Sequence, residues 1–261
     1  MSKTENITIW LKVGSEWPMF ALAINAISDY LPQGGSKCFP YYTYSGEENS
    51  RHENITDWVL KQFQAKYGKS VSKWDIFHYV YAMLHHPQYR ERYAENLKRD
   101  LPHIPLLTRI EAYQAAVRIG SALMDLHIYY EQQEPYPLTP QEDPSVPFGQ
   151  LYIVGKMKLT PNHAAVIVNK GLTLTGIPEA CFRYRLGNRS ALEWVIDQYQ
   201  VSKDARSGIT SDPNRLDDPE YIVRLVRQVV TVSVKTVELV DQLAQLVTQE
   251  DWMGEMVTGE E

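Results

Sequence analysis

Cysteine is scarce in this sequence of 261 residues. Cys38 and Cys181 stand far apart and outside any CxxC pair, so we expect neither a structural zinc site nor a disulfide framework. Both are expected to be small core residues. Apolar runs such as 20–24 and 164–168 stop after about five residues, whereas a membrane-spanning helix needs roughly 18 to 20. No charged region followed by an apolar stretch opens the chain, and we expect a cytoplasmic protein without a membrane partner.

Common catalytic signatures are also missing. The sequence has no GxxxxGK[S/T] phosphate loop, no GxGxxG turn, no GxSxG nucleophile elbow and no HExxH zinc motif. An adenine-N6 methyltransferase would need a second proline after an Asn/Asp-Pro pair, which the pairs at 212–213 and 218–219 lack. We therefore expect no catalytic residue and no metal site in this chain.

Three residue pairs have spacings that catalytic or metal sites use, and we favour a structural interpretation for each. His127 and Glu131 lie four residues apart, but two ligands are too few for a zinc site, and we expect a half-buried histidine beside a solvated acid. Glu193 and Asp197 have the same spacing, typical of a solvated helical face. The pair His85-His86 precedes a proline and is interpreted as a helix end, where an imidazolium complements the helix dipole. An enzyme built on these groups is the least favoured alternative.

The net charge of −6 conceals a basic segment. Residues 151–210 hold eight basic and four acidic residues, a balance of +4, while the rest of the chain holds 18 basic and 28 acidic residues, a balance of −10. The last twelve residues contain five acids and no base. A polyanion, if one binds, is expected at 151–210.

Hydrophobic spacing predicts a predominantly helical α+β fold with a long C-terminal helix. The chain is divided into a β-rich part at 1–53, a helical block at 54–134, a proline-rich linker or long loop at 135–150, a small sheet with helices at 151–247, and an acidic tail at 248–261. Helices are expected at 54–68, 72–86, 87–99, 109–130, 190–200 and 218–243. Short strands are expected at 151–154, 164–168 and 172–174. The last helix is expected to continue through 229–234 despite the strand-like composition there.

The strongest functional candidate is the segment 182–190, FRYRLGNRS. Three arginines, one asparagine and one tyrosine crowd a turn that leads into a helix. Arginine pairs with phosphate or guanine, asparagine can read adenine, and amides at a helix N-terminus complement an anion. The alternative is that Arg185 and Arg189 pair internally with acids such as Glu193. Residue chemistry alone does not decide between the two.

Seven short segments occur together in one known family. They are 54–58 (NITDW), 74–81 (WDIFHYVY), 84–87 (LHHP), 89–93 (YRERY), 134–137 (EPYP), 184–194 (YRLGNRSALEW) and 197–199 (DQY). Through them the sequence resembles the C-terminal specificity region of type ISP restriction-modification enzymes, over about residues 35–243. The resemblance implies a long polypeptide with a nuclease, a helicase-like ATPase, an adenine-N6 methyltransferase and a target recognition domain that reads an asymmetric DNA sequence.

By this resemblance, the chain is the target recognition domain and is not itself an enzyme. It is expected to direct an adjoining adenine-N6 DNA methyltransferase and ATP-dependent nuclease. The resemblance assigns no cofactor to this chain; S-adenosylmethionine, ATP and magnesium are implied only for the other domains. The expected partners are double-stranded DNA and the methyltransferase and helicase-nuclease domains, in cis or in trans. The alternatives are a helical protein-interaction module at 54–130 and an inert gene fragment without DNA binding of its own.

A motif shared by enzymes that read different sequences suits phosphate contact better than base choice. Arg185 and Arg189 are therefore expected to position DNA, whereas the small sheet with its lysines and His163 is a candidate for the groove. The predicted DNA-binding residues are Lys156, Lys158, Lys170, Arg183, Arg185, Asn188, Arg189, Lys203 and Arg206.

Overall fold

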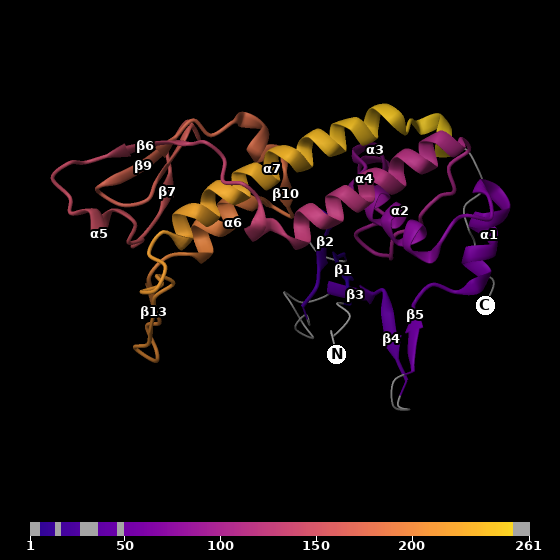
Figure 1. The fold of residues 1–261 in the computed structure, drawn as a ribbon, viewed down its shortest axis with the longest axis horizontal. Coiled ribbons are helices and arrows are strands. Elements are labelled where there is room, and N and C mark those ends of the chain that lie inside the picture. Colours follow the sequence, from indigo (N-terminus) through magenta and orange to yellow (C-terminus); the bar gives the residue numbers. More distant parts are fainter. Residues whose placement is uncertain (1–5, 14–16, 27–35, 46–49, 253–261) are drawn as a thin grey trace. The chain divides into compact units, whose positions relative to one another are not determined.

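The computed structural model describes residues 6–13, 17–26, 36–45 and 50–252. The chain divides into unit 1, residues 1–128 and 238–261, and unit 2, residues 129–237 (Figure 1). Helices and small antiparallel sheets confirm the predicted, predominantly helical α+β class. The end of the expected acidic tail, residues 253–261, lies outside the described residues.

Unit 1 begins with a three-stranded antiparallel sheet. Its strands lie in the order β2 (Phe20–Ile24), β1 (Thr8–Lys12) and β3 (Ser36–Pro40), and a hairpin of β4 (Tyr42–Tyr44) and β5 (Arg51–Glu53) follows. Cys38 is exposed because it lies in the middle of the edge strand β3, whereas Cys181 is buried. The prediction of two core cysteines is therefore wrong for Cys38.

The helices of unit 1 follow the predicted order. They are α1 (Asp57–Tyr67), α2 (Lys73–His85), α3 (Pro87–Arg92), α4 (Ile110–Ile128), the end of α7 (Tyr221–Leu246) and the 3-10 helix η3 (Gln249–Trp252). Ser72 and Asp75 form a reciprocal capping box that starts α2. The helix expected over 87–99 ends at Arg92, because the backbone then closes tighter turns, such as Ala94 N to Glu91 O at 3.3 Å.

Helices α2 and α4 pack directly against each other in unit 1. A Cβ at Gly120 of α4 would lie 1.9 Å from the carbonyl oxygen of His78 in α2, so only glycine permits this approach. Aromatic rings fill the surrounding core: Tyr67 stacks on Tyr113 with ring centroids 3.9 Å apart. The core thus depends on close backbone contact as well as on apolar side chains.

Three histidines are buried in unit 1. His85 donates from Nδ1 to Tyr81 O at 2.8 Å, His86 from Nε2 to Val247 O at 2.9 Å, and His127 Nδ1 lies 2.6 Å from Tyr81 Oη. Burial lowers the pKa of His85 to about 4 and also lowers the pKa of His86 and His127. The predicted imidazolium at 85–86 is therefore wrong, because desolvation outweighs the helix dipole.

The expected half-buried position of His127 is also corrected, since this side chain is only 7% exposed. Helix α4 ends at Ile128, and Glu131 lies beyond it in the 3-10 helix η1 (Tyr130–Gln132). The two residues therefore do not share a helical face.

A four-stranded antiparallel sheet in unit 2 has the order β6 (Thr139–Glu142), β9 (Leu172–Thr175), β8 (Ala165–Ile167) and β7 (Lys158–Leu159). The expectation that 135–150 lacks a regular strand is wrong, because β6 lies within it. Pro140 is tolerated there because β6 is an edge strand. The prediction of a strand at 151–154 is also wrong, because these residues form the end of α5 (Phe148–Leu151) and an irregular segment. The side chains of Asn169 and Asn214 donate hydrogen bonds to backbone carbonyl groups of this segment.

The remaining elements of unit 2 are η2 (Glu179–Arg183), β10 (Arg185–Leu186), β11 (Arg189–Ser190), α6 (Ala191–Gln198), β12 (Ser202–Lys203), β13 (Thr210–Ser211) and residues 221–237 of α7. Helix α7 continues through 229–234 as predicted. Its buried Thr231 donates from Oγ1 to Glu134 O at 2.7 Å, which fixes the chain before β6. Within the described residues, no helix has the length and apolar character needed to cross a bilayer.

Candidate nucleic-acid interface

The segment 182–190 ends in a tight hairpin directly before α6. Strand β10 pairs with β11, and Gly187 in the turn between them has a φ of 73°, a conformation that favours glycine. Ser190 Oγ accepts from Glu193 N at 3.2 Å, and Glu193 Oε2 accepts from Ser190 N at 2.7 Å. This capping box starts α6. The local sequence therefore specifies both the turn and the helix that follows it.

The arginines of this hairpin have different surroundings. Arg189 Nη1 lies 2.7 Å from Asp197 Oδ2, and its guanidinium lies 5.1 Å from the ring centre of Trp194. Arg185 is exposed, and its guanidinium donates to the carbonyl oxygen of Asn188 in the turn; it has no ion pair within the described part of the chain. Internal pairing is thus confirmed for Arg189, but its acid is Asp197; Glu193 is engaged in the helix cap.

Three predicted lysines lie near one end of the four-stranded sheet. Lys158 on β7 pairs with the last residue of β8, and Lys170 follows that strand in the turn to β9. Asn169 in the same turn donates from Nδ2 to Ile153 O at 2.8 Å, which fixes the segment that precedes Lys156. All three lysines are exposed.

The hairpin β12–β13 is fixed to this same segment. Val201 N donates to the carbonyl oxygen of residue 155 at 2.8 Å, and the Asn214 side chain bonds the backbone N and O of Val154, each at 2.8 Å. Lys203 on β12 and Arg206 in the turn belong to this hairpin, in which residues 201–212 are all exposed. It projects away from the rest of unit 2 (Figure 1).

The predicted DNA-binding residues therefore fall into two groups, toward opposite ends of β8. The ring of His163, in the turn before β8, lies 5.0 Å from the ring of Phe182, which precedes the arginine hairpin β10–β11. The arginine hairpin therefore lies toward the start of β8. The lysine group contains Lys156, Lys158, Lys170, Lys203 and Arg206, and the arginine group contains Arg183, Arg185, Asn188 and Arg189. Eight of these nine residues are exposed, and Arg189 is half-buried.

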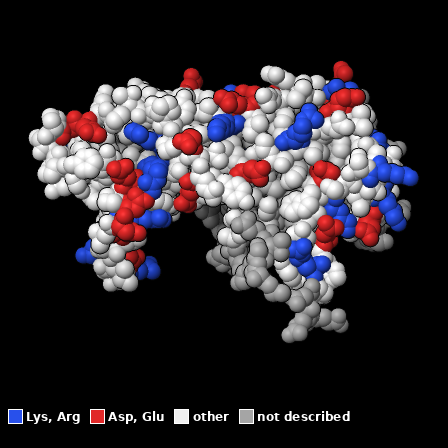
Figure 2. Space-filling view, in the orientation of Figure 1, with Lys and Arg blue, Asp and Glu red and all other residues white. Residues whose placement is uncertain are grey.

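Three acids of the basic segment are engaged in local contacts. Asp204 Oδ1 accepts from Ser207 N at 2.6 Å and from Arg206 N at 3.0 Å, and these bonds, with that of the Ser207 hydroxyl, lower the pKa of Asp204. Glu193 caps α6 and Asp197 pairs with Arg189. Figure 2 shows basic and acidic side chains interspersed over the face of unit 2 in view. The unit therefore offers separate basic groups for an anion, not one continuous patch.

Sequence reasoning missed the two asparagines that position the lysine group. Asn169 and Asn214 each lie in a turn sequence, Asn-Lys-Gly and Asp-Pro-Asn, which signals a local side-chain turn. Their bonds to residues 153 and 154 span 16 and 60 positions. No local signal carries that information.

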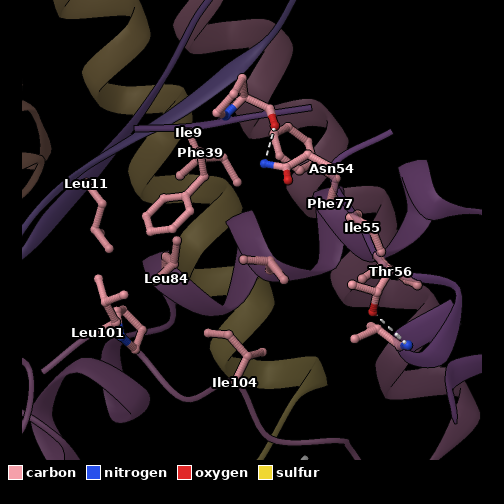
Figure 3. Close-up of a pocket in the computed structure, with 15 residues that line it drawn as sticks. Ile9, Leu11, Phe39, Asn54, Ile55, Thr56, Phe77, Leu84, Leu101 and Ile104 are labelled. Atoms are coloured by element: carbon pink, nitrogen blue, oxygen red, sulfur yellow. Dashed lines mark hydrogen bonds between the residues drawn. The ribbon is translucent and has the colours of Figure 1, made fainter. Parts of the chain in front are cut away.

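An apolar cavity of about 380 Å³ lies in unit 1 (Figure 3). Its lining includes Ile9, Leu11, Phe39, Phe77, Leu84, Leu101 and Ile104. The polar side chains on its wall are already bonded: Asn54 Nδ2 donates to Pro40 O at 3.0 Å, and Thr56 Oγ1 accepts from Val59 N at 3.3 Å. The cavity thus presents no acid or base, and across the described ranges no group of three or more His, Cys, Asp or Glu side chains is placed to hold a metal ion.

Comparison with known proteins relates the chain to DNA-bound restriction enzymes. The ATP-dependent type ISP restriction-modification enzyme LlaBIII, bound to DNA, is 33% identical over 93% of this chain, with a TM-score of 0.78. A nuclease-deletion mutant of the type ISP enzyme LlaGI, in complex with a DNA substrate mimic, is 37% identical over 95%, with a TM-score of 0.76. A DrdV–DNA complex is 36% identical over 92%, with a TM-score of 0.80.

This chain spans only 16%, 18% and 25% of the length of those three chains, respectively. Among curated proteins, none matches the sequence. The family model described as the type ISP C-terminal specificity domain matches residues 1–225. The chain therefore belongs to the family of type ISP C-terminal specificity domains.

Proposed function

We propose that this chain recognises duplex DNA as the specificity module of a type ISP restriction-modification enzyme and has no catalytic residue of its own. One observation carries the proposal: two groups of exposed basic residues lie toward opposite ends of one small sheet, while neighbouring acids are engaged in a cap, a turn and an ion pair. Such groups attract the phosphates of a polyanion. The DNA-bound state of the related enzymes agrees with this assignment.

In this proposal the arginine group positions the duplex. Arg185 is exposed and its guanidinium can pair with phosphate oxygens. The Arg189–Asp197 pair is about half exposed, with side-chain exposures of 42% and 47%, and such pairs contribute at most about 1 kcal/mol. A phosphate can therefore replace Asp197 at small cost.

The lysine group adds further phosphate contacts from Lys156, Lys158, Lys170, Lys203 and Arg206. Sequence preference comes from hydrogen bonds and apolar contacts to base edges in the grooves. Methyl transfer, ATP hydrolysis and DNA cleavage belong to the methyltransferase and helicase-nuclease parts of the enzyme, in cis or in trans. S-adenosylmethionine, ATP and magnesium act there, and this chain directs those parts to a sequence.

Fluorescence anisotropy of the full chain with a pool of random duplexes tests the proposal. Neutralising about four phosphates gives a slope of log K against log salt near −3.6, so affinity falls about 150-fold between about 50 and 200 mM salt. Charge reversal by Arg185→Glu weakens binding. Lys98→Glu in unit 1 is the control: Lys98 is also an exposed base, although it pairs with Glu95, and its reversal leaves binding unchanged. Absence of binding at both salt concentrations refutes DNA recognition by this chain.

A second candidate function is docking of unit 1 onto the methyltransferase part of the enzyme. The apolar cavity favours it, because Phe39 and Leu101 on its wall are 37% and 45% exposed. Association through this surface varies little with salt, unlike DNA binding. Leu101→Asp weakens association with the purified methyltransferase part and leaves DNA affinity unchanged. Unchanged association together with weaker DNA binding excludes this surface as the docking site.

A further inference from the structure

The hairpin β12–β13 is ordered by its own hydrogen bonds while its side chains face solvent. Asp204 N donates to Ile209 O at 2.9 Å, Gly208 N donates to Asp204 O at 2.9 Å, and Gly208 has a φ of 72°. Residues 201–212 are all exposed, and Ile209 is 68% exposed. Ile209 therefore keeps most of its surface in solvent, yet hydrogen bonds fix its backbone position.

The hairpin carries two bases, Lys203 and Arg206, and two acids, Asp204 and Asp212, so its formal charge is zero. Its two acids are bonded within the chain: Asp204 accepts from the turn amides, and Asp212 Oδ1 accepts from Asn214 N at 2.9 Å. Lys203 and Arg206 have no ion pair within the described residues. An exposed branched apolar side chain beside two available cations suits a polyanion that also presents apolar groups.

Duplex DNA is a partner with that chemistry. Its major groove admits a two-stranded β-ribbon, phosphates line its edges, and thymine alone presents a C5-methyl group on its floor. A ribbon entering the groove places Lys203 and Arg206 near phosphates and its apolar side chain near base edges. The hairpin is fixed to residues 154 and 155, and Lys156, which follows them directly, adds a further exposed cation beside it.

We propose that hairpin β12–β13 enters the major groove and that Ile209 reads a thymine through its C5-methyl group, which makes Ile209 a specificity-determining residue. This inference rests on the proposed function. It also separates two tasks: the arginine hairpin at 185–190 holds the duplex, and the β12–β13 hairpin contributes to base choice.

The test removes the thymine methyl group on the DNA side of the contact and the Ile209 side chain beyond Cβ on the protein side. The wild-type chain selects its preferred duplexes from a random pool, and each thymine of the selected sequence is then replaced by deoxyuridine, which removes only the methyl group. At one position this replacement weakens wild-type binding about fourfold, the value expected for one buried methyl contact. Ile209→Ala weakens binding to the thymine duplex by a similar or larger factor and no longer distinguishes thymine from deoxyuridine at that position.

Phe148→Ala is the matched control. Phe148 on α5 belongs to the same unit and is also 68% exposed, but it lies outside the hairpin. This variant keeps the wild-type response to every deoxyuridine replacement. Both substitutions remove exposed side chains, so both proteins fold, and thermal unfolding midpoints equal to the wild type verify this.

Distinct results overturn the inference. If Ile209→Ala keeps full sensitivity to every thymine replacement, Ile209 does not read a base. The same conclusion follows if the wild-type chain is insensitive to all of the replacements. If Ile209→Ala weakens association with the methyltransferase part and leaves DNA preference unchanged, the hairpin contacts protein instead of DNA. A wild-type chain that binds no DNA refutes the proposed function and the inference together, whereas salt-dependent binding without sequence preference refutes the inference alone.

Discussion

The substitution Gly120→Ala tests whether α2 and α4 touch through their backbones. In an exposed helix, alanine is more favourable than glycine by about 1 kcal/mol. At position 120 the new Cβ meets the carbonyl oxygen of His78 at 1.9 Å and the Cβ of Ala82 at 3.2 Å. Two opposing effects therefore act on the free energy of unfolding, and the contact distance decides which is larger.

Relief of the contact requires the helices to separate by roughly 1 Å, because Cβ–O distances below about 3 Å do not persist in folded proteins. A gap of that size forfeits a quarter to a half of the dispersion energy at each packed contact, and overpacking typically costs about 1–3 kcal/mol or more. Because the obstructing atom belongs to backbone, the upper part of that range applies. After the propensity gain, we expect Gly120→Ala to lower the free energy of unfolding by about 2 kcal/mol.

Urea unfolding followed by tryptophan fluorescence measures this change. Five of the six tryptophans belong to unit 1, so the signal reports mainly on the unit that contains Gly120. Gly149→Ala is the control, because its added Cβ meets no atom within 4 Å. A Gly120→Ala protein as stable as the wild type refutes the close approach of α2 and α4.

Three further predictions concern charge. Burial keeps His85 and His127 neutral in the folded chain, with the pKa of His85 lowered to about 4, so the unfolded state binds more protons between pH 6.5 and 4. As the pH falls through this range, the free energy of unfolding decreases by up to about 1.4 kcal/mol per histidine and pH unit. Equal urea midpoints at pH 7 and pH 5 contradict this. Arg109→Ala leaves the 1% exposed Asp251 carboxylate without its cation and lowers the free energy of unfolding by about 2 kcal/mol. Adding Asp251→Asn removes the unpaired charge and restores part of this loss. A double variant no more stable than Arg109→Ala argues against the ion pair. Arg185→Ala reduces the magnitude of the salt slope by about 0.9, and an unchanged slope shows that Arg185 contacts no phosphate.

Elements that nearby residues specify were predictable from sequence. Ser72 with Asp75, and Ser190 with Glu193, place the capping residue and its acid three positions apart, and each pair starts the expected helix. Helix α7 passes through the β-branched run 229–234 because its apolar positions keep helical spacing and pack in the core. At the two capping boxes the local sequence specifies the helix, whereas in α7 burial at helical spacing outweighs the strand propensity of the β-branched run.

The sequence-based predictions failed where contacts between residues distant in sequence determine the local structure. Residues 151–154 are apolar enough for a strand, but Asn169 and Asn214 bind their backbone groups and prevent ladder formation. In the candidate interface, the basic residues and the turn chemistry were readable from sequence, whereas their division into two groups was not. That division follows from strand register and from hydrogen bonds across many positions.

Helix α7 gives residues 221–237 to unit 2 and residues 238–246 to unit 1, which makes unit 2 an insertion within unit 1. Exchange of unit 2 between related genes therefore requires two crossovers, near 128 and near 237. The second falls inside a continuous helix, where adding or losing one residue rotates everything beyond it by about 100°. Leu243 and Val247, both fully buried in unit 1, would then leave the core. Recombination that changes DNA specificity is thus constrained to preserve chain length at this junction.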